Sequence, residues 1–254
     1  MNYELTMDIL FLGTGTSTGV PQIGCKCETC TSTDIKDKRL RASVLITEGD
    51  SQILIDAGPD LRRQLLANQI SRLSAILLTH EHYDHVGGLD DVRPLGESDI
   101  YAEKRVLGVI QRNTPYCFAE KRYPGVPTIH LHEIDENEFY INNIKIQTIR
   151  VMHANLPILG FRVGKFAYLT DVKTIDEKNI ELLKDLDVLV LNALRPAQHL
   201  SHLSLSEALD IAAKVGARKT YFTHMNHHMG LHETVNQLLP ENIELAYDGL
   251  KLSL

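Results

Sequence analysis

Residues 79–85 read Thr-His-Glu-His-Tyr-Asp-His and directly follow a largely apolar run from Leu73 to Leu78. Such a run is typical of a buried strand, so the polar residues belong to the loop at its end. The loop carries four candidate metal ligands: His80, His82, Asp84 and His85. Imidazole and carboxylate groups bind hard or borderline divalent cations. We therefore expect a metal site at this strand end, rather than a solvated polar loop.

A site for two cations needs about three or four protein ligands per metal. Three single candidates each follow another predicted strand: His153 after 144–151, Asp171 after 166–169 and His224 after 220–222. Taken singly, each is better explained as a capping or hydrogen-bonded polar residue. Together they share the carboxyl end of a strand, which is where open α/β folds place their ligands.

These motifs resemble those of the metallo-β-lactamase superfamily, whose His-x-His-x-Asp-His signature stands here at residues 80–85. The resemblance extends over nearly the whole chain, from Leu10 to Gly249. It implies that His80, His82 and His153 hold one metal, that Asp84, His85 and His224 hold the other, and that Asp171 bridges the two. We expect these two ions to be zinc or manganese.

The order of apolar patterns predicts two sheets. Strands are expected at 9–12, 43–47, 52–55, 75–78, 100–102, 128–131, 138–141, 144–151, 158–163, 166–169, 188–191, 220–222 and 243–247. Helices are expected at 60–67, 103–112, 176–183, 204–215 and 233–239. An αββα sandwich of the α/β class, the metallo-β-lactamase fold, accommodates this order. Because no linker-like segment divides the chain, residues 1–254 are expected to form one domain. The proline-rich segment 113–127 is equally compatible with a surface loop and a lid.

Bulk composition narrows the class of substrate. The chain has 254 residues, 43% of them hydrophobic, and a net charge of −7. A protein that binds long nucleic acid usually carries a basic surface, so a small-molecule substrate is expected instead. No apolar run approaches the ~20 residues of a membrane span, and no basic and apolar leader opens the sequence. We expect a cytoplasmic protein without membrane contact. The sequence is also compatible with a homodimer.

A second metal site is predicted from Cys25, Cys27 and Cys30, a Cys-x-Cys-x-x-Cys cluster. In a cytosolic protein such a cluster indicates a zinc site rather than disulfides. The alternative is three reduced thiols in a surface loop. A closed tetrahedral site needs a fourth ligand, for which His227 is the first candidate and His228 the second.

This cysteine loop, together with Thr-His-x-x-His at 223–227, resembles the PhnP-like phosphodiesterase group. That resemblance implies a structural zinc held by Cys25, Cys27, Cys30 and His227, apart from the catalytic metals. The PqqB group of cofactor-biosynthesis proteins shares the cysteine motif, so the motif does not fix the substrate.

The expected chemistry is hydrolysis of a small phosphodiester, with cyclic phosphodiesters included. Two cations ~3.5–4 Å apart can hold a hydroxide that attacks phosphorus, and the leaving alkoxide then needs a proton. His202 precedes the predicted helix 204–215, and its position alone indicates a residue of the helix cap region. The resemblance instead implies a general acid that acts with Asp84 in catalysis. Arg195 is a weaker candidate for binding the substrate phosphate. Asp56 is a candidate for orienting a ligand histidine, with an exposed turn residue as the alternative.

Three other functions remain open at this stage. A lactam or thioester hydrolase would share the fold but has no need of His202. A transfer-RNA 3′ processing nuclease would share the phosphodiester chemistry, but no basic insertion is evident. A non-catalytic zinc protein of the PqqB type would not need the complete ligand set together with His202.

Overall fold

A computed structural model places residues 6–254, and 14 strands in this part of the chain form two seven-stranded sheets. In spatial order, the first sheet consists of β14 (Lys251–Ser253), β1 (Met7–Gly13), β2 (Ser43–Glu48), β3 (Ser51–Ile55), β4 (Ala75–Leu77), β5 (Glu97–Ala102) and β6 (Thr128–Glu133). The second consists of β13 (Ile243–Leu245), β12 (Lys219–Thr223), β11 (Val188–Asn192), β10 (Phe166–Leu169), β9 (Leu156–Val163), β8 (Ile144–His153) and β7 (Glu138–Ile141).

Each sheet is part antiparallel and part parallel. In the first, β14, β1, β2 and β3 pair antiparallel, and β3 to β6 pair parallel. In the second, β7 to β10 pair antiparallel, and β10 to β13 pair parallel. Parallel strands are usually buried on both faces, which matches the continuous apolar runs seen in the sequence.

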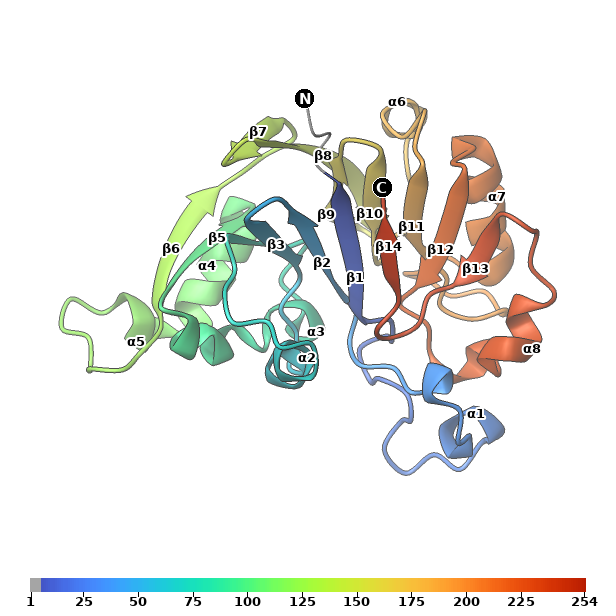
Figure 1. The fold of residues 1–254 in the computed structure, drawn as a ribbon, viewed down its shortest axis with the longest axis horizontal. Coiled ribbons are helices and arrows are strands. Elements are labelled where there is room, and N and C mark those ends of the chain that lie inside the picture. The colour runs from blue at the N-terminus through green and yellow to red at the C-terminus, as the bar shows by residue number, and fades with distance from the viewer. Residues whose placement is uncertain (1–5) are drawn as a thin grey trace.

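Helices cover the two outer faces, as Figure 1 shows. Their bounds are α1 (Glu28–Thr31), α2 (Leu61–Ala67), α3 (Tyr83–Val86), α4 (Lys104–Asn113), α5 (Pro115–Phe118), α6 (Glu177–Glu181), α7 (Leu205–Val215) and α8 (His232–Asn236). Short 3₁₀ turns are η1 (Ile35–Asp37), η2 (Leu89–Leu95) and η3 (His227–Met229).

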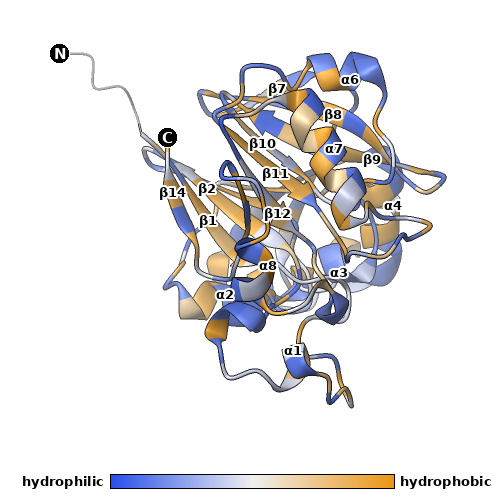
Figure 2. Ribbon diagram, turned by 90° about the vertical axis from the view of Figure 1, so that its right-hand side faces the viewer, coloured by the Kyte–Doolittle hydropathy of each residue, from blue (hydrophilic) through white to orange (hydrophobic). Residues whose placement is uncertain are grey.

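Three apolar clusters hold these layers together. One joins residues of both sheets, such as Phe11 and Tyr168, and fills the space between them. The second packs α6 and α7 on the second sheet, and the third packs α2 and α4 on the first. Figure 2 shows the corresponding hydrophobic colour along the strands of both sheets. The predicted αββα sandwich is confirmed.

The start of α7 fixes the loop that precedes it. Ser204 accepts a hydrogen bond from the backbone N–H of Glu207, and the Glu207 carboxylate accepts one from the backbone N–H of Ser204. This reciprocal capping box satisfies two N–H groups that a helix start leaves unpaired. Gly216 ends the helix in the left-handed conformation, at φ 72°. His202 lies two residues before the cap, so its loop is anchored to a rigid element.

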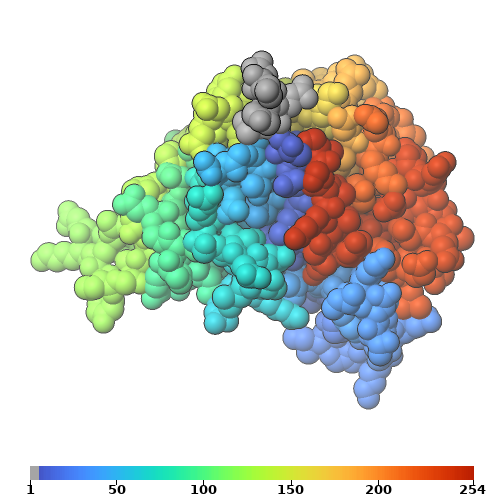
Figure 3. All heavy atoms as spheres, in the orientation of Figure 1, coloured from blue at the N-terminus to red at the C-terminus, as the bar shows by residue number. Residues whose placement is uncertain are grey.

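Two segments project from the sandwich. The loop that carries α1 extends below α8, and the segment around α5 extends outward from the end of the first sheet (Figures 1 and 3). The second segment is the proline-rich stretch for which the sequence left loop and lid open. It folds as the short helix α5 followed by an irregular loop up to β6.

Across residues 6–254, no helix combines the length and the apolar composition that a membrane crossing requires.

Candidate metal centre and active site

The seven candidate ligands come from strand ends of both sheets. In the first sheet, β4 leads into the loop of His80 and His82 and then into α3, which carries Asp84 and His85. In the second sheet, β8 ends at His153, and β10 and β12 lead to Asp171 and His224. The structure brings all seven into one cluster, in overlapping groups whose ligand atoms lie within 4.8 Å of one another: His80, His82 and His153; His80, His85 and Asp171; Asp84, His85 and His224.

Three residues of this centre have an unusual backbone. Asp56, Asp171 and His224 adopt positive φ angles of 63°, 58° and 57°. Each directly follows, or lies two residues beyond, the end of a strand, at β3, β10 and β12. The left-handed region is unfavourable for residues with a Cβ and is retained mainly where surrounding structure enforces it. The turn at each strand end thus points a functional side chain into the centre.

The second of the two metal positions expected from the sequence is already compact. His85 Nε2 lies 3.2 Å from Oδ2 of Asp84 and 3.2 Å from Oδ2 of Asp171. His224 Nε2 lies 3.5 Å and 3.3 Å from the same two oxygens. Asp171 therefore touches both histidines and also belongs to the group of His80, which is the placement a bridging ligand needs.

Further hydrogen bonds orient the imidazoles. His85 Nδ1 donates to Oδ2 of the fully buried Asp56 at 2.7 Å. Asp56 also accepts from the backbone N–H and hydroxyl of Thr79, whose oxygen lies 3.0 Å from His80 Nδ1. His153 Nδ1 lies 2.8 Å from the carbonyl oxygen of Ser201. In His85 and His153 this leaves the Nε2 atom for a ligand, whereas Nε2 of His80 lies 3.0 Å from Nδ1 of His82, within the group of His80, His82 and His153.

The carboxylates of the centre shift the pKa values of its histidines, and the histidines shift those of the carboxylates. Burial alone would lower the pKa of His85, but Asp56, Asp171 and Asp84 outweigh burial and raise it well above the usual value. Burial likewise would raise the pKa of Asp84 and of Asp171, but the neighbouring histidines hold both below their usual range. Three carboxylates thus converge on the His85 imidazole, a position in which divalent cations would supply positive charge.

Unpaired nitrogens support the same fit. His85 Nε2 and both ring nitrogens of His224 are buried and have no hydrogen-bond partner among the described residues, although the Asp84 and Asp171 carboxylates lie 3.2–3.5 Å from the two Nε2 atoms. A buried polar atom without a partner is costly and needs an explanation. Imidazole nitrogens and carboxylate oxygens at these separations fit zinc or manganese, so the donor set is suited to two divalent ions.

His202 lies beside this cluster. Its Nδ1 is 3.6 Å from Oδ1 of Asp171, and it forms a further group with Asp171 and His153. Burial, together with the neighbouring histidines, lowers the pKa of His202 to about 3, although Asp171 opposes the shift. The free imidazole is therefore neutral at pH 7. An anionic substrate in the cleft would favour the imidazolium and raise this pKa.

Arg195 contacts its own loop. Its Nη2 donates to the carbonyl oxygen of Gln198 at 3.2 Å, and its buried Nε has no partner among the described residues. Arg195 also contributes to lowering the pKa of the neighbouring His199, after burial. The side chain thus retains a free donor near the His202 loop, but no contact ties it to the metal cluster.

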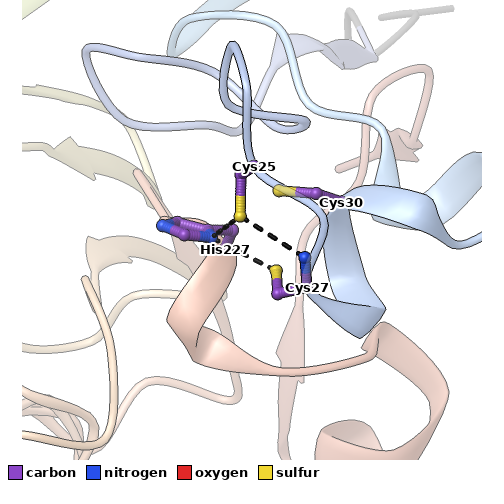
Figure 4. Close-up of side chains that lie close together, drawn as sticks. All are labelled: Cys25, Cys27, Cys30 and His227. Carbon is purple, nitrogen blue, oxygen red and sulfur yellow. Dashed lines mark hydrogen bonds between the residues drawn. The ribbon is translucent and has the colours of Figure 1, made fainter.

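The cysteine cluster forms separately, between the α1 loop and η3. The Sγ atoms of Cys25 and Cys27 lie 3.2 Å and 3.3 Å from Nδ1 of His227, and Cys30 completes the group (Figure 4). No disulfide joins cysteines within residues 6–254. Of the two histidines considered from the sequence, His227 faces the thiols, whereas His228 is not part of the group.

Thiol acidity suits a metal at this second position. His227 lowers the pKa of Cys27 to about 6, whereas burial raises that of Cys30 to about 11. Three thiolates close together repel one another, so a cation that neutralises their charge is favoured at this position. Three sulfur atoms and one imidazole within 4.8 Å match the donor set of a closed tetrahedral zinc site.

Several supporting residues escaped the sequence analysis. Thr79 bonds Asp56 and His80, and the Ser201 carbonyl holds His153. The position of Thr79 directly before His80 was the available signal; a backbone carbonyl such as that of Ser201 leaves no trace in a sequence. Asp56, considered as an orienting carboxylate or an exposed turn residue, is buried against His85.

Comparison with known proteins supports the family. Residues 51–225 match the sequence model described as Beta-lactamase superfamily domain. A crystal structure described as a new diphosphatase from the PhnP family is 38% identical, covers 98% of each chain and superposes with a TM-score of 0.93. Zinc-bound PqqB from Methylobacterium extorquens shares the fold, with a TM-score of 0.79 at 20% identity over 97% of this chain and 100% of that one.

A curated relative carries a different description. The chain is 43% identical, over 96% of its length, to a protein of Porphyromonas gingivalis named octanoyltransferase. The chain covers only 51% of that relative. It is also 30% identical to a coenzyme PQQ synthesis protein B from Methylorubrum extorquens, of which it covers 48%. The chain thus spans about half the length of these curated relatives.

Proposed function

Because this chain belongs to the metallo-β-lactamase superfamily and, within it, to the PhnP family, we propose that this hydrolase acts on small phosphodiesters, cyclic ones included. The observation that carries the proposal is the position of His202. Its imidazole lies 3.6 Å from the carboxylate shared by the histidines of the cluster. A proton donor at that distance serves a phosphodiester, whose alkoxide leaving group needs protonation.

The proposed ligand assignment follows the clusters. His80, His82 and His153 would hold one divalent ion, Asp84, His85 and His224 the other, and Asp171 both. Two ions so held would supply a water nucleophile at neutral pH and neutralise phosphoryl charge. Asp56 and Thr79 keep the ligand rings in place. We assign the Cys25, Cys27, Cys30 and His227 group to a structural zinc.

His202 is proposed to deliver the proton to the departing oxygen. Substrate phosphate would favour its charged form, and the backbone carbonyl of His202 is held by Lys173 Nζ at 3.5 Å. Arg195, with its free donor in the same loop, is proposed to contact the substrate phosphate.

The first prediction tests this role. His202→Ala should lower kcat roughly 10²–10⁴-fold on a phosphodiester with an alkyl leaving group, while metal content stays unchanged. The loss should be much smaller with p-nitrophenolate as leaving group, because that anion needs little protonation. Kinetics on both substrates, with metal analysis of each preparation, check it. Equal losses on both would indicate substrate binding instead, and loss of metal would make His202 a ligand.

Acyl hydrolysis is the second candidate, and the octanoyltransferase relative favours it. A thioester or lactam carbonyl would be attacked by the same nucleophile, but a thiolate leaving group does not need the proton that His202 is proposed to give. The chain covers only 51% of that relative, so the name by itself does not place the transferase activity in the matched half.

One panel separates these functions. Metal-quantified protein is assayed on bis(p-nitrophenyl) phosphate, cyclic phosphodiesters, a diphosphate, nitrocefin, an octanoyl thioester and precursor transfer RNA. Phosphodiester turnover that exceeds all others supports the proposal. Preferred cleavage of the thioester or nitrocefin would replace it with the acyl candidate, and no turnover at all would favour a zinc-binding role.

We also propose that residues 1–254 form one domain, since the apolar cluster between the sheets draws on strands from both ends of the described chain. Clustered free thiols persist in reducing compartments, which supports a cytoplasmic location.

A further inference from the structure

A hollow of about 180 Å³ lies between the segment of the metal ligands at 80–85 and the projecting segment around α5, which we call the arm. Its walls come from α3 and η2 on one side and from the end of α4 and the start of α5 on the other. Tyr83 and Tyr116 lie at these opposite walls, and apolar residues such as Val86 and Ile110 line the space between them. None of these residues has a part in the proposed metal chemistry.

Tyr83 is placed by its neighbours in the sequence. It stands between the candidate ligands His82 and Asp84, yet its side chain is 70% exposed. Its ring lies against Gly87, where an added Cβ would come within 2.8 Å of two ring carbons. Glycine at 87 therefore allows the ring to lie against the end of α3. An exposed aromatic ring beside a reaction centre offers a free face for stacking.

Tyr116 is held on the opposite wall. Its hydroxyl donates to Oδ1 of Asp90 at 2.8 Å, and Asp90 also accepts two bonds from Arg93 at 2.7 and 2.8 Å. Burial and the Asp90 carboxylate raise the pKa of Tyr116 to about 12, so its hydroxyl remains a donor at neutral pH. The chain Arg93–Asp90–Tyr116 thus fixes the arm to η2 and sets the width of the hollow.

The chemistry of the lining selects a class of ligand. Valine, leucine and isoleucine side chains line the hollow and exclude a strongly hydrated group, so a charged ligand is disfavoured there. The amide of Asn113 and the hydroxyl of Thr114 can pair with polar atoms at the edge of a ring. The hollow is smaller than the 300–1,000 Å³ typical of sites for drug-sized molecules, so it suits a single ring system.

We propose that the hollow between Tyr83 and Tyr116 is a subsite for a neutral planar ring of the nucleobase class, carried by the organic group of the substrate. This inference rests on the proposed function, because it places the phosphate at the His/Asp cluster and the ring beyond Tyr83. It makes Tyr83 a residue that determines specificity, and it gives the projecting arm a role as one wall of the subsite.

The test compares two substrates with the same reacting group. Metal-loaded protein is assayed on 2′,3′-cyclic AMP and on glycerol 1,2-cyclic phosphate, which lacks the ring. Tyr83→Leu should reduce the ratio of kcat/KM for the first substrate over the second about 10- to 100-fold, the scale of one base stacked on an aromatic ring. Tyr83→Phe, which keeps the ring, should preserve the ratio, as should Tyr140→Leu, a matched exposed tyrosine on β7.

An unchanged ratio in Tyr83→Leu would overturn the inference. If wild-type protein hydrolyses neither substrate, the proposed function fails first, and the subsite is then judged by binding alone. Calorimetry with adenosine on metal-free protein should give affinity for wild type and at least tenfold weaker affinity for Tyr83→Leu. Equal binding by the two proteins, or no binding by either, would reject the subsite.

Discussion

The molecule contains two clusters of metal-binding side chains that are built in opposite ways. The His/Asp cluster is assembled from strand ends of both sheets, and most of its members are buried. The Cys₃His cluster is held between a projecting loop and η3, and Cys25 and Cys27 are only partly buried. Their closest link is along the chain, where His224 belongs to the first and His227 to the second.

The difference shows what each cluster contributes. In the first, the sheets and buried hydrogen bonds such as Asp56 to His85 fix the ligands in advance, so the fold supports the site. In the second, few elements hold the α1 loop against the body of the protein, so the site supports the fold. Mutations should therefore separate the two, with activity lost in one case and stability in the other.

The largest effect is expected for Asp171→Ala. This change removes the carboxylate that contacts His85 and His224, so the active centre should lose metal and hydrolysis should fall to background. The cysteine site should keep its zinc. Metal analysis by mass spectrometry, alongside turnover on the best phosphodiester of the panel, measures both. Retention of the full metal content would show that Asp171 does not bridge.

Cys27→Ser tests the other side of the comparison. Loss of a structural zinc should cost several kcal/mol of folding free energy, a part of the ~10–16 kcal/mol binding terms found in zinc modules. The melting temperature and the soluble yield should fall, whereas kcat per correctly folded, metal-loaded molecule should change little. Lys26→Ser, at an exposed position of the same loop outside the ligand set, serves as the control. An unchanged melting temperature would argue against a structural zinc.

A smaller effect is expected for Asp56, which is not a candidate ligand but orients the ligand His85. Asp56→Asn keeps the shape of the side chain but weakens its bond to His85 Nδ1, 2.7 Å long in the native protein. Partners of this kind typically contribute 10–100-fold to metal affinity or activity. Titration with a competing chelator should show that loss at the active centre only. If zinc retention by the cysteine cluster fell equally, the two sites would not be separable.

The smallest effect concerns pH and lies near the α1 loop. His232 accepts a bond from Arg39 Nη2, and burial, with Arg39, lowers the pKa of His232 to about 4. Because the folded-state pKa lies below the usual 6.5, the contribution to stability is present above pH 6.5 and is lost as pH falls towards 4. At pH 4.5 the loss should be about 2 kcal/mol.

His232→Asn keeps an acceptor for Arg39 without a group that titrates in this range. Its melting temperature should therefore fall less than that of wild type between pH 6.5 and 4.5. The exposed His130→Gln serves as the control, since it should follow wild type. Parallel curves for wild type and His232→Asn would remove His232 from the acid response.

Much of this architecture was predictable because the patterns that encode it are local. Each predicted strand and helix was found, within a few residues, because apolar periodicity reports burial directly. The short elements α1, α3 and α5 and the terminal strand β14 were missed. They span three or four residues each, too few for a period to be read.

The centre was predictable for a related reason. Its ligands are of distinctive chemical types and follow strands, so the strand ends indicated where His153, Asp171 and His224 would meet. What no pattern could indicate was contact between distant residues that lack such a distinctive chemical type or position. The pairing of Tyr116 with Asp90, and of Ser201 with His153, depends on how loops fold over the sheets.

The positive φ angles at Asp56, Asp171 and His224 have an evolutionary consequence. Glycine would occupy such positions without strain, and asparagine with little. A lineage selected for heat resistance alone would tend to replace these three residues and lose the centre. At these three positions backbone strain and metal-binding chemistry are therefore linked, so relieving the strain with glycine would remove the side chain that the centre uses.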